Sequence, residues 1–364
     1  MPTVRSETGM VCSVDRAASA VGVEILRRGG SAVDAAIATN AVLAVTTQHM
    51  CGLGGDLFAL VHDETGPPAV LNASGRSGAG ADAEKLRAQG HSEMIHRGDI
   101  SSVPVPGCVD GWIALHDRFG RVPFAELLEP AVQLASEGFE ASPLLAKVAT
   151  TVANVANNTE LRDISQGSTV KRPGIARTLR AISDSGREGF YGGEFGEALL
   201  VMGAGEYSED DLERVDAEWV EPLGIEAFGH RVWTVPPNSQ GYLSLAGAWI
   251  AERVGLSVDP ADPAWAHVLI ESSRAAAFDR TLVLSDQADG PTLISPERLG
   301  PRADRIDGTQ SVDWGDSYAD GGTIYLCATD STGMGISLIQ SNCRDFGSYL
   351  VAGDTGIFLH NRGI

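Results

Sequence analysis

The segment Asp320-Gly-Gly-Thr-Ile-Tyr-Leu-Cys-Ala-Thr-Asp330 combines two glycines, a threonine and an alternating strand pattern. After it, Ser331-Thr-Gly-Met-Gly-Ile-Ser-Leu-Ile-Gln-Ser341 predicts a turn at Asp330–Gly333 and a second strand. A threonine in this setting can become the first residue of a new chain if the peptide bond before it cleaves itself. Its hydroxyl is then a nucleophile, and its own α-amine can act as general base. The alternative is a glycine turn that leads into an ordinary strand.

Thr323 is therefore the candidate nucleophile of an N-terminal nucleophile hydrolase, and Gly322-Thr323 is the candidate cleavage site. Glycine at positions 321 and 322 suits self-cleavage. The Thr323 hydroxyl has to attack the preceding carbonyl from a contorted backbone, and glycine adopts such conformations at low cost.

Read from about Val11 to the last residue, the chain resembles the gamma-glutamyltranspeptidase family. The segments that carry the resemblance occur in the family's order: Gly30-Ser-Ala-Val-Asp-Ala-Ala36, Cys51-Gly-Leu-Gly-Gly-Asp-Leu-Phe58, Ser74-Gly-Arg-Ser77, Val105-Pro-Gly-Cys-Val-Asp-Gly-Trp112, Pro130-Ala-Val-Gln-Leu-Ala135, Pro236-Pro-Asn-Ser239, Phe346-Gly347-Ser348 and Thr355-Gly356-Ile357. The resemblance implies an α/β fold, a four-layer αββα sandwich of the N-terminal nucleophile hydrolase type, with the Thr323 strand at its centre.

The resemblance also implies roles for single residues. Thr323 falls on the nucleophile, and Gly322 on the residue whose carbonyl is released by cleavage. Arg76 falls on the arginine that holds the α-carboxylate of the glutamyl group, a task that suits a planar guanidinium. Ser341 falls on a hydroxyl that hydrogen-bonds the nucleophile. A solvated loop arginine and a strand-end serine without a role are the alternatives for the last two residues.

The chain departs from the family pattern near these residues. Ile324 stands where better-studied members carry a second threonine. Cys343 stands where they carry an asparagine that contacts substrate, with Asn342 displaced by one position, and Arg362 replaces a usual glutamine. Asn342, Cys343 and Arg362 are thus candidate substrate-binding residues. This region is more similar to a cytoplasmic bacterial branch of the family, and the scaffold also resembles glutaryl-cephalosporin acylases and oxamate amidohydrolase.

The function implied by the resemblance is gamma-glutamyl transfer or hydrolysis on glutathione-like amides, with water or an acceptor amine as second substrate and no cofactor. Cleavage would give a large-subunit-like region, 1–322, and the start of a small-subunit-like region, 323–364, in a heterodimer or heterotetramer. Family members continue beyond this point and there supply an oxyanion hole, which is worth about 2–4 kcal/mol. Residues 1–364 alone are therefore expected to be uncleaved and inactive. A catalytically silent binding protein is the alternative.

Composition excludes several other classes of protein. A formal net charge of −21 argues against nucleic acid as a partner. The first eight residues lack the apolar core of a secretory signal, and the apolar run 32–45 is too short to cross a bilayer, so a cytoplasmic protein is expected. Neither the histidines nor the cysteines show a metal-binding spacing, and no metal is expected. The cysteines are expected to be free core thiols: Cys12, Cys51, Cys108, Cys327 and Cys343.

Apolar periodicity and capping residues predict the main helices. A helix is expected over Asp15–Arg28, and Ser31 can cap a second one that runs to Val45. Further expected elements are a strand over Asp56–Val61 and helices over Phe124–Glu137, Ile175–Ser183, from Ser208 onward, and Tyr242–Val254. The polar run Ser311–Gly322 is expected to be a flexible linker that reaches the cleavage site.

Overall fold

The computed structural model describes residues 3–63, 66–315 and 322–364. Its strands are β1 (Gly9–Cys12), β2 (Asp56–His62), β3 (Ala69–Ala73), β4 (Phe139–Glu140), β5 (Thr169–Val170), β6 (Glu218–Val220), β7 (Leu223–Ala227), β8 (His230–Thr234), β9 (Ile324–Asp330) and β10 (Gly335–Ser341). Its α-helices are α1 (Arg16–Arg27), α2 (Ala32–Thr46), α3 (Ala83–Ala88), α4 (Cys108–Phe119), α5 (Phe124–Glu137), α6 (Pro143–Ala149), α7 (Pro173–Ser185), α8 (Glu188–Tyr191), α9 (Glu194–Met202), α10 (Glu209–Glu213), α11 (Tyr242–Val254), α12 (Pro263–Ala277), α13 (Arg280–Val283), α14 (Gly290–Leu293) and α15 (Pro296–Ala303). Short 3₁₀ turns occupy Ile100–Ser102 and Thr150–Val152.

The chain divides into two compact units. The first contains residues 1–64, 71–218 and 321–364, and the second contains residues 65–70 and 219–320. The predicted division between residues 322 and 323 does not describe these compact units, because it concerns cleavage of the peptide bond. Both sides of that bond belong to the first unit, so the large-subunit and small-subunit regions stay a prediction about processing.

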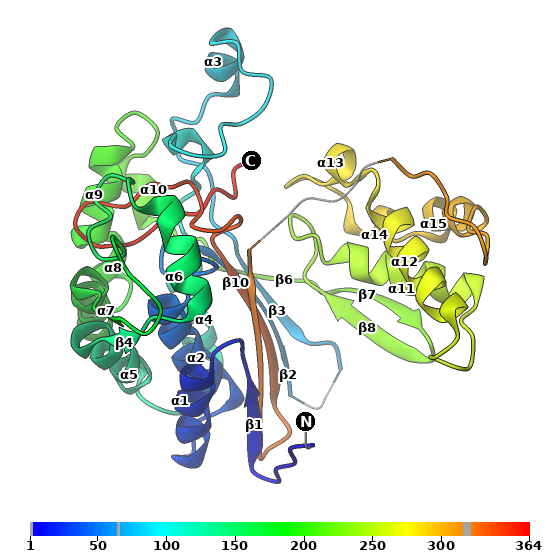
Figure 1. The fold of residues 1–364 in the computed structure, drawn as a ribbon, viewed down its shortest axis with the longest axis horizontal. Coiled ribbons are helices and arrows are strands. Elements are labelled where there is room, and N and C mark those ends of the chain that lie inside the picture. Colours follow the sequence, from blue (N-terminus) through cyan, green and yellow to red (C-terminus); the bar gives the residue numbers. More distant parts are fainter. Residues whose placement is uncertain (1–2, 64–65, 316–321) are drawn as a thin grey trace. The chain divides into compact units, whose positions relative to one another are not determined.

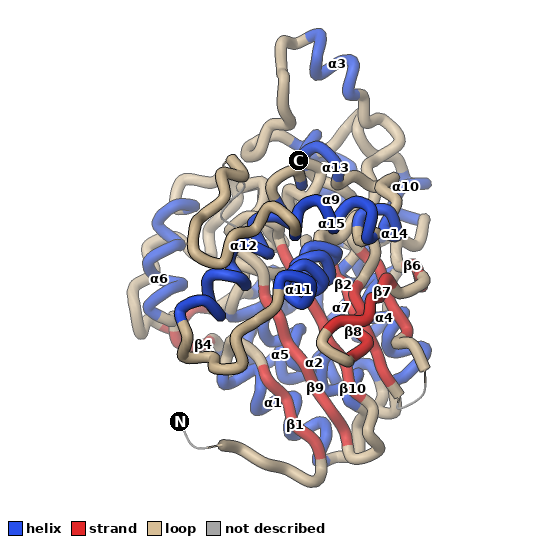
Figure 2. Tube along the Cα trace, turned by 90° about the vertical axis from the view of Figure 1, so that its right-hand side faces the viewer, coloured by secondary structure: helices blue, strands red, loops and turns tan. Residues whose placement is uncertain are grey.

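The first unit contains β1, β9, β10, β2 and most of β3 from a six-stranded sheet in the order β1-β9-β10-β2-β3-β6 (Figures 1 and 2). β9 and β10 form the antiparallel hairpin that the sequence predicts, with Gln340 opposite Ile324 and Gly335 opposite Thr329. β1 pairs with the outer side of β9, and β2 pairs with β10. The strands that follow Thr323 are therefore inserted between strands from the first 62 residues of the chain.

Helices cover one face of this sheet, and α2 is the central one (Figure 1). All fifteen residues of α2 are buried, because it packs on β9 and β10 on one side and on α1, α4 and α5 elsewhere. The alanine-rich sequence of α2 permits these close approaches. Asn40, a buried polar residue of α2, accepts a 2.7 Å hydrogen bond at its Oδ1 from Trp112 Nε1.

Local signals fixed the ends of these helices as expected. Asp15 caps α1 by accepting from Ala18 N, and Ser31 forms a full capping box with Asp34 at the start of α2. The predicted bounds of α5 and α11 agree with the structure. The strands β6 and β7 were missed, since the sequence of that region was interpreted as mainly helical, whereas a strand that ends at Pro236-Pro237 was expected and corresponds to β8.

The second unit packs the β7-β8 hairpin and α11, α12, α14 and α15 around two apolar clusters. Phe228 and Gly229 both have positive φ and make the tight turn of the hairpin. The buried carboxylate of Glu271 on α12 accepts hydrogen bonds from Val312 N and Trp314 Nε1, which anchors the first part of the predicted linker. Residues 316–321 of that linker lie outside the described residues. In the part that is described, no helix is long and apolar enough to cross a membrane.

The α1–α2 contact generates a stability prediction. A Cβ on Gly22 would overlap Thr39 Oγ1 and lie 3.0 Å from Ala35 O, both on α2. Gly22→Ala should therefore force the helices apart and lower the free energy of unfolding by roughly 1–3 kcal/mol. Denaturant titration followed by circular dichroism measures this change.

Gly247→Ala is the matched control. Gly247 also lies inside a helix, α11, and the nearest atoms that a Cβ there would meet are 3.9 Å away. That variant should be stabilised by about 0.5–1 kcal/mol, because alanine loses less backbone entropy than glycine. Equal effects of the two variants would contradict the close packing of α1 on α2.

Candidate active site

The hairpin register brings the predicted nucleophile to the end of β10. Gln340 lies opposite Ile324, so Ser341, the last residue of β10, lies beside Thr323, which directly precedes β9. Thr323 Oγ1 and Ser341 Oγ are 2.9 Å apart. Thr323 is exposed, whereas Ser341 is buried. The structure thus brings together the two residues that were predicted to be catalytic.

The Ser341 hydroxyl has three partners, and their chemistry fixes the direction of each hydrogen bond. Cys343 N donates to Ser341 Oγ over 2.8 Å, and Ser341 Oγ donates to Gly322 O over 3.0 Å. A hydroxyl has one proton and two acceptor lone pairs. With its proton on Gly322 O, Ser341 must accept from Thr323 Oγ1. The Gly322 carbonyl is consequently polarised, and the lone pairs of the Thr323 hydroxyl stay available for attack.

Gly322 is held by close packing. The contorted backbone expected at this cleavage site stays a prediction. A Cβ at this position would lie 3.1 Å from Asp345 N and 3.8 Å from His49 O. The glycine is explained by this confined space. Gly321 lies outside the described residues.

The hydroxyls of Thr323 and Ser341 form what we call the hydroxyl cluster. Two of the predicted substrate-binding residues lie near it, Cys343 and Arg362. Cys343 follows Ser341 by two residues and has positive φ. Arg362 Nε donates to Asp56 Oδ2 over 2.5 Å, and Asp56 is the residue opposite Ser341 in the β10–β2 register. About a third of the Arg362 side chain is exposed, while Asp56 is fully buried. The Arg362 guanidinium therefore lies at the edge of the hydroxyl cluster, with its positive charge partly compensated by Asp56.

The side chain of Asn342 makes its contact away from the hydroxyl cluster. Its side chain is fully buried, and its Nδ2 donates to Gln48 O over 3.0 Å. Its backbone N donates to Met50 O over 3.1 Å. These contacts brace the loop between α2 and β2. The predicted substrate contact of Asn342 stays a prediction, and this geometry does not support it.

Arg76 lies on the loop after β3 and faces two carboxylates. Its Nη2 is hydrogen-bonded to Glu218, and its Nε lies 3.8 Å from Asp216 Oδ1. Asp216 is shared with Arg214, whose Nε lies 2.9 Å away. The Arg76 side chain is 45% exposed, so the rest of its guanidinium group is accessible to solvent. None of its hydrogen bonds or ion pairs in the described residues reaches Thr323, and its role as carboxylate anchor stays a prediction.

Sequence reasoning missed two buried histidines beside the cluster. Burial lowers the pKa of His49 to about 4, although the charge of Asp345 opposes the shift. Burial also lowers the pKa of His360 to about 4, against the effect of Asp56. His360 Nε2 lies 3.0 Å from Pro104 O, which fits a neutral ring that donates from this nitrogen. No motif identifies either residue, because their surroundings come from distant parts of the chain.

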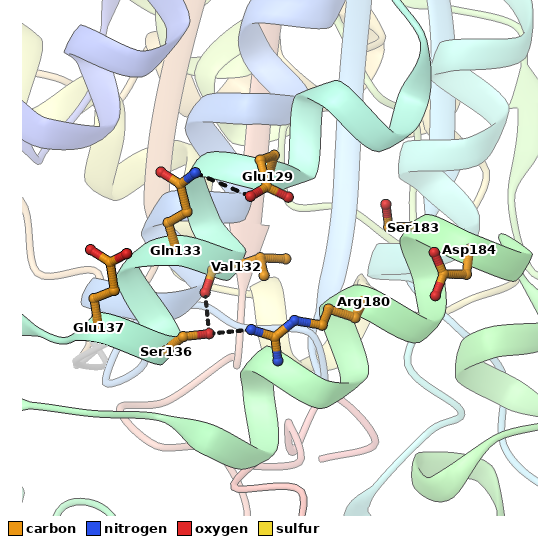
Figure 3. Close-up of a pocket in the computed structure, with 8 residues that line it drawn as sticks. All are labelled: Glu129, Val132, Gln133, Ser136, Glu137, Arg180, Ser183 and Asp184. Atoms are coloured by element: carbon orange, nitrogen blue, oxygen red, sulfur yellow. Dashed lines mark hydrogen bonds between the residues drawn. The ribbon is translucent and has the colours of Figure 1, made fainter.

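A surface hollow of about 480 Å³ lies between α5 and α7 (Figure 3). Figure 3 shows Arg180 reaching from α7 to Ser136 on α5, and Arg180 Nη2 donates to Ser136 Oγ over 2.6 Å. Acidic side chains and Gln133 form much of the remaining wall. The hollow contains none of the predicted site residues. Across the described residues, no group of three or more His, Cys, Asp or Glu side chains is placed to hold a metal ion.

Comparison with known proteins extends over nearly the whole chain. The sequence profile described as gamma-glutamyltranspeptidase matches residues 18–364. The "glutathione hydrolase-like YwrD proenzyme" of Bacillus subtilis is 35% identical over 97% of this chain and 70% of its own length. The "oxamate amidohydrolase proenzyme" of Klebsiella pneumoniae is 33% identical over 98% of this chain and 71% of its own length.

A solved structure agrees with these sequence matches. The cephalosporin acylase of Bacillus halodurans superposes with a TM-score of 0.87 and 31% identity, over all of this chain and 72% of that protein. This likeness confirms the expected αββα fold of the N-terminal nucleophile hydrolases, to which the six-stranded sheet and its helical layer belong.

The lowered pKa values of the buried histidines predict how the free energy of unfolding depends on pH. An unfolded histidine takes up a proton near its ordinary pKa of about 6.5, whereas folded His360 stays neutral down to about 4. The free energy of unfolding should therefore fall as the pH is lowered from about 6.5 to about 4. The contribution of His360 is on the order of 3 kcal/mol. Urea titrations at a series of pH values measure it.

His360→Gln keeps a donor for Pro104 O and removes the titrating group, so its stability should depend less steeply on pH in this window. His230→Gln, at an exposed histidine of the β7-β8 hairpin, is the control and should keep the native slope. The same pH dependence in the native protein and His360→Gln would show that His360 does not titrate as described.

Proposed function

Because the chain belongs to the gamma-glutamyltranspeptidase family, we propose that it matures by cleavage at Gly322-Thr323 and then uses Thr323 to hydrolyse or transfer gamma-glutamyl groups from glutathione-like amides. The observation that carries this proposal is the hydroxyl cluster. Ser341 bonds both the candidate nucleophile and the carbonyl of the candidate scissile bond. An ordinary strand start needs neither contact.

The maturation step follows from these contacts. Thr323 Oγ1 attacks the Gly322 carbonyl carbon and passes its proton to Ser341 Oγ, which gives its own proton to Gly322 O. The hydrogen bond from Ser341 thus stabilises the negative charge as it develops on that oxygen. The same proton moves to the Thr323 nitrogen as the C–N bond breaks, which leaves an ester between Gly322 and Thr323 Oγ1 and frees the Thr323 amine. Water hydrolyses the ester, which gives a carboxylate at Gly322 and an N-terminal threonine.

Turnover uses the same residue twice. The α-amine of Thr323 takes the hydroxyl proton as Oγ1 attacks the substrate amide, and the leaving amine receives a proton. The acyl group is then an ester on Thr323. Water or an acceptor amine resolves the ester and regenerates the hydroxyl. The exposed position of Thr323 supports access by small-molecule substrates.

Arg76 supports an acyl donor that carries a carboxylate. A guanidinium binds a carboxylate through parallel charge-assisted hydrogen bonds, and only two of the three Arg76 nitrogens are engaged by Asp216 and Glu218. Relatives named for glutathione and for oxamate both act on amides that bear a carboxylate. A related amide of the oxamate or cephalosporin class is therefore the second candidate substrate.

We also propose that the protein belongs to the cytoplasmic bacterial branch and works as a processed heterodimer or heterotetramer. The five cysteines, an odd number without the spacing of a disulfide framework, support a reducing compartment. The relatives' description as proenzymes supports processing. Cell fractionation and native mass spectrometry test the two statements, and an exported or unprocessed protein would contradict them.

The cleavage proposal predicts distinct effects of two substitutions. Thr323→Ala should abolish both cleavage and amide hydrolysis, because it removes the attacking oxygen. Ser341→Ala removes one hydrogen-bond donor to the developing oxyanion and should slow cleavage by roughly 10²–10³-fold. Intact-protein mass spectrometry over time measures cleavage, and release of p-nitroaniline from gamma-glutamyl-p-nitroanilide measures turnover.

Thr323→Ser is the matched control for these variants. It keeps a hydroxyl and an α-amine at the same position and should still cleave and turn over. If Thr323→Ala is still divided between residues 322 and 323, Thr323 is not the cleaving group. If the protein stays a single chain without activity even when it is expressed with any sequence that follows residue 364 in its gene, the binding-protein alternative gains support.

The role proposed for Arg76 predicts a change in specificity. Arg76→Lys should raise KM for gamma-glutamyl-p-nitroanilide by about tenfold or more, because an ammonium cannot reproduce a two-pronged contact. For an analogue without the α-carboxylate, Arg76→Lys should raise KM much less. Steady-state kinetics with both substrates gives the comparison.

Arg214→Lys is the control, because Arg214 shares Asp216 with Arg76 and disturbs the same carboxylate. It should leave the preference for the α-carboxylate intact. Equal losses on the two substrates in Arg76→Lys would mean that Arg76 only supports the structure.

A further inference from the structure

Two of the free cysteines are neighbours across strands. In the antiparallel pairing of β1 with β9, Cys12 lies directly opposite Cys327. Residues opposite each other in an antiparallel pair project from the same face of the sheet. Cys12 also contributes to the raised pKa of Cys327, which agrees with neighbouring thiols. The register therefore places the two cysteines side by side at this edge of the sheet.

Their exposure separates them from the other cysteines. Cys12 is exposed and Cys327 is half-buried, which corrects the expectation that all five would be core thiols. Cys51 and Cys108 are fully buried, and burial raises the pKa of both thiols. Thiolates are the reactive species, so these two thiols should be inert. Only the β1–β9 pair combines adjacent sulfur atoms with access to solvent.

The distances required by a disulfide match this arrangement. A disulfide joins Cα atoms that are about 4.4–6.8 Å apart. Directly opposed residues of antiparallel strands have Cα separations of about 4.5–5.5 Å. No movement of β1 relative to β9 is therefore needed to close the bond.

We propose that Cys12 and Cys327 form a reversible disulfide that joins β1 to β9. The Cys12 thiolate attacks a small-molecule disulfide, which forms a mixed disulfide and releases one thiolate. The Cys327 thiolate then attacks the Cys12 sulfur and releases the second thiol. Both cysteine thiols lose their protons, and the small disulfide is reduced to two thiols. Burial, and next the Cys12 charge, raise the pKa of Cys327 in the reduced pair. The mixed disulfide removes the Cys12 charge, so the Cys327 thiolate forms more readily for the second, resolving step.

The location of the pair gives the bond a consequence that rests on the proposed function. Cys12 precedes the Gly322-Thr323 bond, and Cys327 follows it by a few residues. In the cleaved protein the disulfide would join the two new chains covalently. Under reducing conditions the same chains would be held by strand pairing and packing alone.

The test treats the protein with hydroxyethyl disulfide, which has no gamma-glutamyl amide and cannot be consumed as a substrate. Remaining thiols are alkylated, and peptides are mapped by mass spectrometry without reduction. We expect a linked peptide pair that contains Cys12 and Cys327 and disappears after dithiothreitol. Cys12→Ser and Cys327→Ser should each eliminate it, while Cys343→Ser should leave it unchanged.

Cleavage is tested separately in the same samples. Cleaved native protein should run as one band on a non-reducing denaturing gel and as two bands after reduction. Thr323→Ala, which should remain one chain, should still give the linked peptide pair, so failure of cleavage cannot hide the disulfide. Equal alkylation of Cys12 and Cys327 before and after oxidation in native protein would overturn the proposal. The same holds if Cys327 pairs with another cysteine.

Discussion

The site depends on the register between β9 and β10. Because Gln340 lies opposite Ile324, the Ser341 hydroxyl falls beside Thr323 and within hydrogen-bonding distance of Gly322 O. A slip by one residue would turn Ser341 to the other face of the sheet and replace it by the amide side chain of Gln340 or Asn342. Pairing of β10 with β2 along seven residues and burial of the β9 and β10 side chains against α2 resist such a slip.

The same sheet explains how a cut at Gly322-Thr323 can leave the fold intact. β9 and β10 lie between β1 and β2, so residues after the cut are hydrogen-bonded on both sides to residues before it. Asp330 adds a polar anchor, since its carboxylate accepts from Ala32 N at the start of α2 and lies 3.2 Å from Arg121 Nη1. Gln340 adds another through two 2.8 Å hydrogen bonds with the backbone of Gly52.

Sequence reasoning succeeded where the signal was local. Ser31 and Asp34 are three residues apart, and the strand pattern around Asp330–Gly333 is continuous, so the capping box and the hairpin could be predicted. It failed where partners are distant. The carboxylates that face Arg76 come about 140 residues later, and the burial of His360 depends on segments that the sequence does not connect. Cys12 was misjudged because only the sheet order places β1 at an edge.

The Ser341 hydroxyl explains why one residue can serve both stages of the proposed chemistry. Before cleavage its proton is bonded to Gly322 O, and its lone pairs accept from Cys343 N and Thr323. Cleavage converts the Gly322 carbonyl into a carboxylate on a separate chain end. The Ser341 proton can then turn to Thr323 while Cys343 N still fixes the Ser341 oxygen. The hydrogen bond that activates the precursor thereby becomes available to orient the nucleophile of the mature protein.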